Sequence, residues 1–277
     1  MANSDHVAKL KLGVWAWNEW RSQFPHLTPD LSGLSLQDWN LESANFAEVD
    51  FAQANLENAT LIQANLSGAN LSNACLAKAQ LQDAQVKGAN LVIANLAQAN
   101  LQGADLSEAN LIGANLQDAS LVKTDLHRAN LIGTSLRNVD LRWAMLDCAK
   151  LNRSDLGNAI LSEANLCNAT LCQSNLNGAI LIDTQMYGAD LSQANLRAAN
   201  LCHAYLVRAK LADADLCFAR CDWANLSRAN LQGAKLEGTS LRGTNLVGSN
   251  LQGAYLAGIN WAMTTLDKTQ FDDPALF

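Results

Sequence analysis

An apolar residue returns at every fifth position from Leu31 to Phe271, without a single slip. This register has 49 central positions, and 42 of them are Leu. The other seven are Phe46, Phe51, Val86, Met186, Cys221, Trp261 and Phe271. Because a boundary between globular domains would interrupt the phase, the whole stretch is predicted to form one elongated repeat domain.

The positions before each central residue, called i, repeat as well. At i−2, 33 of 49 residues are Ala and ten are Ser or Thr, and at i−1, 28 of 49 are Asn or Asp. A helix with this period would spread its Leu side chains around the whole surface, and a strand would alternate them between its faces. The period therefore predicts a chain that turns after every five residues and points each central residue inward. Asn and Asp suit the tight backbone, since their short side chains bond to it and tolerate unusual dihedral angles.

The motif Ala-(Asn/Asp)-Leu-x-x, as in Ala64-Asn65-Leu66-Ser67-Gly68, resembles that of the pentapeptide repeat proteins. The resemblance covers 241 of 277 residues. It implies an all-β fold, a right-handed quadrilateral parallel β-helix (a solenoid) of about twelve coils, with an N-terminal α-helical cap. At roughly 4.8 Å per coil, such a rod is about 58 Å long. The Trp-rich N-terminus and the long unbroken repeat are similar to cyanobacterial members, most of which have no assigned activity.

Three segments are expected: residues 1–29 as a helical cap and linker, 30–271 as the pentapeptide-repeat β-helix, and 272–277 as a C-terminal tail. Residues 5–24 are predicted to form one amphipathic helix with Asp5 as its N-cap and Pro25 as its stop. Bulky side chains near both ends are expected to cover the open core, or at the C-terminal end to form a homodimer contact. These are Trp15, Trp17, Trp20, Trp39, Trp261, Phe271 and Phe277.

Composition limits the classes of partner. A net charge of −7 and a pI near 5.0 disfavour direct nucleic acid binding, which needs a basic stripe. Seven Cys residues form no CxxC pair and no Cys/His cluster with metal-ligand spacing, which suits a reducing cytoplasm and predicts no metal. The N-terminus has no uninterrupted apolar run typical of a signal peptide, and no apolar stretch is long enough to span a membrane. Two Lys residues are too few for a strong membrane-surface interpretation of the N-terminal helix.

Residues 20 apart should stack in rows, and two groups of outward positions are apolar. One group follows the central residues directly in three rows' steps, and the second lies further along the chain near a Trp. Stacked apolar groups mark a contact surface for a protein partner, or they stabilise the sheet by packing across strands, and both interpretations stay open. The residues are Val92, Ile93, Ile112 and Ile132 in the first group and Trp143, Ile160, Ile180 and Ile182 in the second.

Some pentapeptide repeat proteins imitate duplex DNA and bind gyrase, which offers an alternative function. That mechanism needs carboxylates in close succession along one face. Here each row holds at most two consecutive acids, and basic residues interrupt the series. The pairs are Asp30 with Asp50, Asp105 with Asp125, and Glu163 with Asp183.

Catalysis finds little support in the sequence. The four His residues lie far apart, and the nearest approach to a constellation is Cys202 stacked on Asp222, beside His203 and Cys221. Cys221 is itself a central position and should point inward, and no third group completes a triad. Glycine residues sit mostly at i+2, where they serve turns, and no phosphate-binding loop is present. We therefore expect a non-enzymatic cytoplasmic scaffold that needs no cofactor and presents a surface to an unidentified protein.

Overall fold

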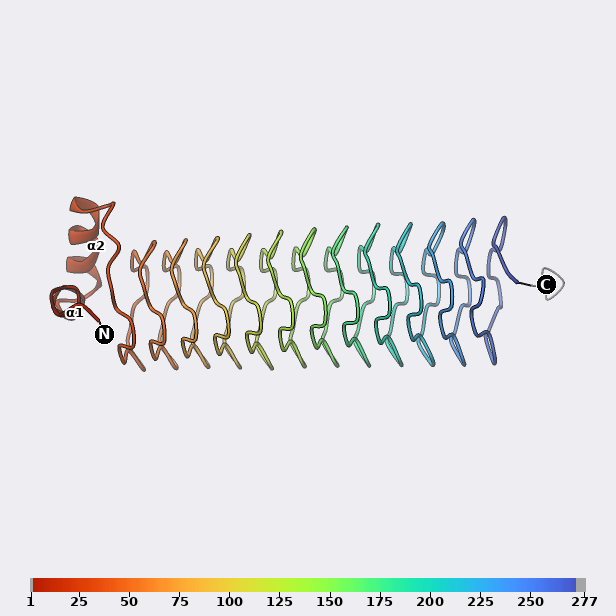
Figure 1. The fold of residues 1–277 in the computed structure, drawn as a ribbon, viewed down its shortest axis with the longest axis horizontal. Helices are drawn as coiled ribbons and strands as arrows, with labels where there is room; N and C mark the ends of the chain where they lie inside the picture. The colour runs from red at the N-terminus through yellow and green to blue at the C-terminus, as the bar shows by residue number, and fades with distance from the viewer. Residues whose placement is uncertain (1, 273–277) are drawn as a thin grey trace. The chain divides into compact units, whose positions relative to one another are not determined.

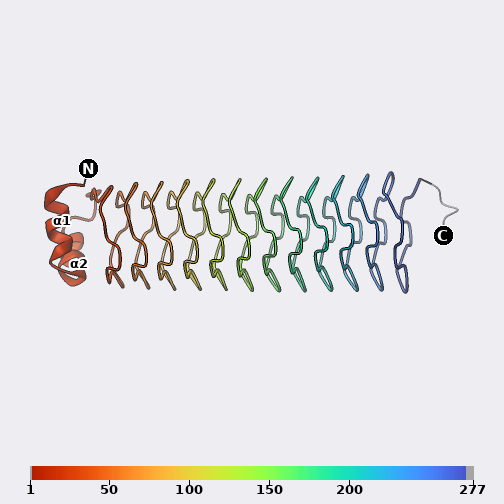
Figure 2. The ribbon, with the colours of Figure 1, turned by 90° about the horizontal axis from the view of Figure 1, so that it is seen from below.

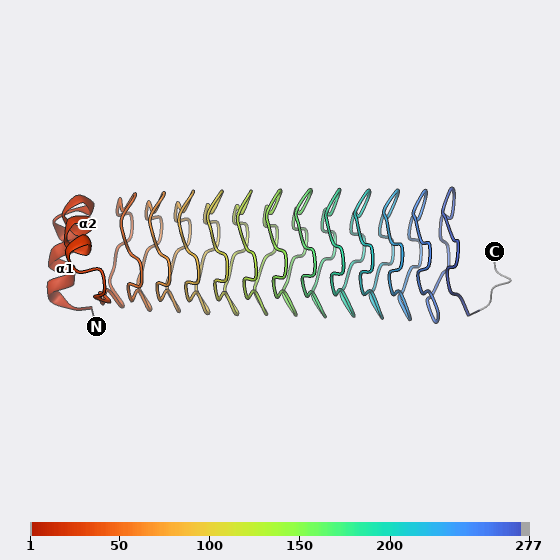
Figure 3. The same cartoon turned by 90° about the horizontal axis from the view of Figure 1, so that it is seen from above.

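The structure, a computed structural model, describes residues 2–272. They fall into two compact units, Met1–Ser135 (unit 1) and Leu136–Phe277 (unit 2). Within each unit the backbone winds through a stack of narrow coils (Figures 1, 2 and 3). Phe277, expected at the C-terminal end, lies outside the described residues.

Unit 1 begins with two helices, α1 (Ser4–Lys11) and α2 (Val14–Gln23), where the sequence predicted one helix over residues 5–24. The single-helix prediction was wrong, because Gly13 adopts a φ of 96° that an α-helix does not accept. The cap prediction was also displaced by two residues. The side chain of Asn3, and not that of Asp5, accepts the N–H bonds of the first turn.

Each five-residue step in the repeat contains one type II β-turn. The N–H of Ala64, for example, donates to the carbonyl of Leu61 over 3.0 Å. The third residue of each turn, at i+2, has a positive φ, which is the signature of this turn type. Every i+2 residue from Gly33 to Lys268 is of this kind, and 34 of these 48 are not glycine. The unusual dihedral angle therefore falls at i+2, and not at the Asn and Asp of i−1 as the sequence suggested.

Residues 20 apart pair between neighbouring coils through parallel single-residue bridges, one in each pentapeptide. Asn45 pairs with Asn65 and Asn65 with Gln85 in unit 1, and Asn175 pairs with Asn195 in unit 2. Each coil is also joined to the next by backbone bonds such as that from the N–H of Leu66 to the carbonyl of Gln85, at 2.6 Å. This pairing makes each unit a β-helix, as predicted.

The interior consists of central residues and their small i−2 neighbours. Every central residue from Leu31 to Leu251 is buried. At i−1, Asn and Asp side chains accept the N–H two residues later, as from Ala52 to Asp50 at 3.0 Å, which confirms their predicted bonding to the backbone. Their amides also form ladders, since the Nδ2 of Asn70 donates to Asp50 over 2.8 Å.

The first coil of unit 1 is covered by α2. Trp17 is fully buried, and its indole N–H donates to the carbonyl of Asn45 over 2.8 Å. Asn18 accepts the N–H of Asn45 at 2.8 Å and donates to the carbonyl of Ser43 at 3.0 Å. The guanidinium of Arg21 donates to the carbonyl of Ala47 over 2.9 Å. These side chains take the bonds that a preceding coil would have supplied.

The other predicted end residues lie in different environments. Trp20 and Trp39 are half-buried, but Trp15 is 79% exposed and covers nothing of the core. In unit 2 the rings of Trp261 and Phe271 meet edge to face, with centroids 6.4 Å apart. Both are only half-buried, as are the central residues Leu256 and Leu266. Within the described residues, the last coil therefore keeps part of its apolar interior open to solvent.

Candidate interaction surfaces

The first predicted apolar group lies on one line of turns in unit 1. Ile93 and Ile112 are 62% and 37% exposed, and Val92 and Ile132 are half-buried. The side chain of Ile93 leans over the next coil at Gly113, because a Cβ built on that glycine would lie 3.7 Å from the Cγ1 of Ile93. The structure thus brings these four residues together on the outside of unit 1.

The second group lies in unit 2. Ile160 and Ile180 pair in one row, Ile182 follows two residues later, and all three are half-buried. Trp143 is 43% exposed, and the guanidinium of Arg142 sits 5.6 Å from the centroid of its ring. Nearby Met145, which the sequence reasoning missed, is 45% exposed and adds a flexible apolar side chain.

Two exposed rings in unit 2 were also missed. Phe218 and Trp223 occupy successive i+2 positions of one coil and are 54% and 46% exposed. Each ring rests on a glycine of the next coil, since a Cβ built on Gly238 would lie 2.8 Å from Phe218 and one on Gly243 only about 2.6 Å from Cδ2 and Cζ3 of Trp223. The sequence signal was an aromatic residue at i+2 followed 20 positions later by glycine. We call Phe218 and Trp223 the aromatic pair.

Basic side chains accompany the aromatic pair. The guanidinium of Arg197 lies 5.4 Å from the ring centroid of Phe218, within reach of a cation–π contact. Arg220, between the two rings in sequence, is exposed and lies 3.5 Å from a carboxylate oxygen of Asp222. Aromatic and arginine side chains are the residues that most often dominate binding energy at protein interfaces.

Carboxylates of unit 2 are mostly neutralised within the unit. Asp140, Asp155, Asp190 and Asp215 each contact an Arg or Lys at 2.6 to 3.3 Å. Burial raises the pKa of the Asp155 carboxyl, but hydrogen bonds from Gly157, Asn175 and Arg137 outweigh it and leave the pKa lowered. The pKa values of the other three carboxyls are lowered by the same balance of burial against hydrogen bonds.

The arrangement around Cys202 does not form a nucleophilic site. The thiol lies 3.7 Å from the carboxylate of Asp222, whose other oxygen is bonded by the hydroxyl of Ser240. Burial raises the pKa of the Cys202 thiol and that of the fully buried Cys221 thiol, so neither is poised as a thiolate. No shift or contact brings His203 into the cluster, and the sequence expectation of too few outward groups holds here.

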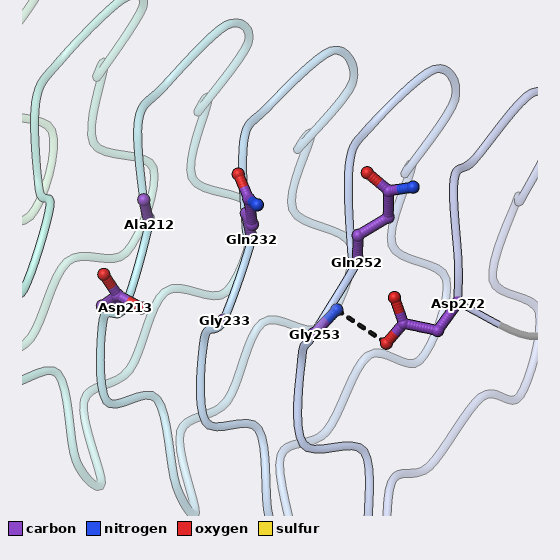
Figure 4. A pocket seen from close by; sticks show the side chains of 7 residues that line it. All are labelled: Ala212, Asp213, Gln232, Gly233, Gln252, Gly253 and Asp272. Atoms are coloured by element: carbon purple, nitrogen blue, oxygen red, sulfur yellow. Dashed lines mark hydrogen bonds between the residues drawn. The ribbon is translucent and has the colours of Figure 1, made fainter.

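A shallow groove of about 630 Å³ runs across successive coils near the end of unit 2 (Figure 4). Its floor is the bare backbone of Gly233 and Gly253, flanked by Gln232, Gln252 and Asp213. Asp272 closes one end, where its carboxylate accepts the N–H of Gly253 over 2.8 Å. Among these lining residues no base, thiol or cation is available to partner the carboxylates, so the groove lacks the groups of an acid–base site.

The part of the chain that the structure describes holds no group of three or more His, Cys, Asp or Glu residues placed to bind a metal ion. In the same residues neither helix has the length and apolarity needed to cross a membrane.

A sequence profile for pentapeptide repeats matches the chain in eight copies, over residues 30–61, 54–91, 89–128, 124–162, 159–197, 194–233 and 224–260. Among solved structures, the chain is similar to HetL, a pentapeptide repeat protein involved in heterocyst differentiation regulation in the cyanobacterium Nostoc sp.. The identity is 29%, over 92% of this chain and 96% of that one, with a TM-score of 0.38.

Two further solved structures are similar over part of the chain. Rfr23, a pentapeptide repeat protein from the cyanobacterium Cyanothece, is 32% identical over 39% of this chain and 60% of its own, with a TM-score of 0.25. QnrB1, a plasmid-mediated fluoroquinolone resistance protein, is 15% identical over 76% of this chain and 91% of its own, with a TM-score of 0.37. No protein of curated function matches.

Proposed function

Because the chain belongs to the pentapeptide repeat family, whose members form right-handed β-helices and act as structural or interaction proteins, we propose that it is a non-enzymatic scaffold that presents its outer surface to a protein partner. In this proposal the coils are quadrilateral and number about twelve. Residues 1–29 cap the β-helix of residues 30–271, and 272–277 form a tail. The interior residues serve folding, so the contacts with the partner come from outward positions.

The aromatic pair is the observation that carries this proposal. Turn positions on a solenoid face water, yet Phe218 and Trp223 expose about half of their large rings there. Each ring is held flat by the glycine beneath it, which keeps the apolar face presented at little cost in side-chain entropy. Rigid aromatic side chains with arginine beside them are typical anchors of a protein interface.

The proposal is tested by affinity capture from lysate of the source organism, with matched variants. Trp223→Ala removes a ring, and Gly243→Ala displaces the same ring, because the new Cβ would overlap it. Gly248→Ala is the control, since its φ of 68° nearly equals the 66° of Gly243 but its Cβ would meet only Arg228 at an ordinary 3.7 Å. We expect a protein that wild type and Gly248→Ala retain and the other two variants lose. Equal recovery by all four folded proteins would contradict the proposal.

The apolar groups foreseen from the sequence are proposed as additional contact surfaces. They are Val92, Ile93, Ile112 and Ile132 in unit 1, and Trp143, Ile160, Ile180 and Ile182 in unit 2. Arg142 over Trp143 and the flexible Met145 support the second of these, since arginine, tryptophan and methionine are enriched at interfaces.

A homodimer through the C-terminal end is a further proposal. The half-buried Leu256, Trp261, Leu266 and Phe271 leave apolar area that a second copy would cover. Light scattering on Phe271→Glu tests it, because a dimeric mass that the substitution leaves unchanged would exclude this contact. We also propose a cytoplasmic location without membrane or direct nucleic acid contacts, supported by seven cysteines that are all free thiols.

A gyrase-binding DNA mimic is the second candidate function, and one observation favours it. Residues 22–77 contain six acidic residues and no Lys or Arg. In unit 2, by contrast, basic side chains contact most of the partly buried carboxylates. Inhibition of gyrase supercoiling by the purified chain, lost when Glu42 and Glu48 are replaced by Gln, would support this candidate. Unimpaired supercoiling at a large excess of the chain would exclude it.

A further inference from the structure

One line of turns in unit 1 carries no charge. The rows that begin at Asn70, Ser72, Asn73 and Cys75 face outward, and each continues through the next three coils. Their 16 positions hold no Asp, Glu, Lys, Arg or His. We call these rows the uncharged strip. The other lines of turns in the same coils all carry charges of both signs, as with Lys78 and Asp118 or Lys87 and Glu108.

We propose that the uncharged strip is a self-association face, which packs against the same strip of a second copy of this chain. The strip includes Val92, Ile93, Ile112 and Ile132, so the inference deepens the proposed function by naming the occupant of that surface, and it rests on the surface being a contact site. Charged side chains are the usual protection of flat β-surfaces against one another, and this strip has none.

Repeat spacing is the reason for choosing a second copy. The outward side chains recur once per coil, at the spacing of hydrogen-bonded strands, roughly 4.8 Å. A helix or an extended peptide lying along the strip repeats its side chains at other distances, so it meets only some of the rungs. A second strip has the same rise and meets every rung, as in the tight packing of stacked sheets.

Covering the strip leaves few polar groups without partners. The Oδ1 of Asn90 accepts the N–H of Val92 at 3.3 Å, and its Nδ2 donates to Asn70 at 3.1 Å. The amide of Asn115 donates in the same way to Asn95 at 3.2 Å. Because these amides already bond within the chain, their removal from water is less costly than that of free amides. The relief is also low, since Ile93 lies over Gly113 and glycine follows again at Gly133.

The size of the strip sets the strength of the contact. Its apolar part extends over a few coil steps and covers on the order of 300 Å² per copy, from the strand spacing. A stable interface buries about 800 Å² per partner. The association is therefore weak and depends on concentration.

Sedimentation equilibrium of the full chain tests the inference, with protein from about 10 µM to about 1 mM to span weak dissociation constants. We expect the average mass of the wild type to rise toward that of a dimer across this range. Ile112→Asp and the more exposed Ile93→Asp should abolish the rise, because each places a carboxylate on both sides of the contact. Gln102→Asp is the control, since Gln102 is exposed at the same i+1 position on a different turn.

Three measurements separate the outcomes. Sulfate should strengthen the association, as it does for apolar contacts, whereas an association of charges would weaken. Phe271→Glu should leave the rise intact, which distinguishes the strip from a C-terminal dimer. A wild type that stays monomeric to about 1 mM, or a rise that survives in folded Ile93→Asp, would overturn the inference. Neither result affects capture through the aromatic pair, so failure of the proposed function remains distinguishable.

Discussion

The i−2 position shows how a single polar atom changes what a buried residue contributes. Most of these residues are Ala, which place no polar atom in the interior. Thr134 adds a hydroxyl that donates to the carbonyl of Leu111 in the preceding coil over 3.0 Å. Ser154 bonds within its own turn, to the carbonyl of Leu151 at 2.6 Å. The hydroxyl of Ser249 is buried with no hydrogen-bond partner among the described residues.

Two serine substitutions should therefore have opposite effects on stability. Ser249→Ala removes a buried hydroxyl that has no partner, and we expect the free energy of unfolding to stay level or rise by up to about 1 kcal/mol. Ser154→Ala removes a hydrogen-bonded hydroxyl and should lower it by about 1 kcal/mol. Urea denaturation of both variants beside the wild type measures the difference. If both variants are destabilised equally, the contrast in bonding has no energetic weight.

Among the elements of the fold, α2 covers the first coil by side-chain bonding as well as by packing. Trp17, Asn18 and Arg21 all bond to backbone groups of residues 43–47. These residues lie at positions 17, 18 and 21 of a helix, so they share the face that meets the coil. The cap therefore replaces part of a missing coil with the tips of three side chains.

Loss of one cap side chain should open this edge. Asn18→Leu leaves the N–H of Asn45 and the carbonyl of Ser43 without their partners, and we expect a loss of about 2 kcal/mol in the free energy of unfolding. Hydrogen exchange of residues 43–47 should quicken. Ser22→Ala is the matched control, because the exposed Ser22 hydroxyl bonds only to Glu19 within α2. Equal exchange rates in both variants would show that the edge does not depend on Asn18.

How far the sequence foretold these elements depends on whether a position repeats. The inward rows and the parallel pairing 20 residues apart follow from the five-residue register, since a slip would expose every Leu at once. The break at Gly13 lies outside the register, where a helical pattern of apolar residues outweighed one glycine. The aromatic pair was also missed, because its glycine seats lie 20 residues away and matter only once the coils are stacked. The four residues of the first apolar group were found because they share rows.

For the whole molecule, the lowered carboxyl pKa values predict a loss of stability in acid. The pKa of Asp30 is lowered chiefly by the backbone N–H of Ser32, and those of Asp140, Asp155, Asp190 and Asp215 are lowered by hydrogen bonds that outweigh burial. A group whose pKa is lower in the folded state stabilises the fold above its unfolded value, about 3.9 for Asp, and that stabilisation is lost as the pH falls through the folded value.

Urea denaturation at neutral pH and at several values below about pH 4 tests this dependence. We expect the midpoint to fall with pH over that acid range. Asp155→Asn should show a smaller fall than the wild type, because one of the titrating groups is gone. A midpoint that is independent of pH down to about 2 would contradict the assignment.

Nearest-neighbour stacking predicts which deletions the molecule tolerates. Removing residues 71–90 takes out 20 residues, so every row resumes in phase and only one set of coil contacts is lost. We expect a folded protein with an unchanged circular dichroism spectrum. Removing residues 71–87 shifts the phase by three positions and should expose the Leu side chains that follow. The two deletions differ by three residues, so chain length cannot account for a difference in folding.

The left-handed residues at i+2 bear on the handedness of the amino acids themselves. An L-residue in this conformation is strained by on the order of 1 kcal/mol, and 34 non-glycine residues share it at one fixed phase of the repeat. A D-residue prefers the same dihedral angles. A synthetic pentapeptide polymer with a D-amino acid at every fifth position would therefore relieve the strain without the loss of chain stiffness that glycine brings. The repeat is, in its backbone, already a heterochiral design written in one enantiomer.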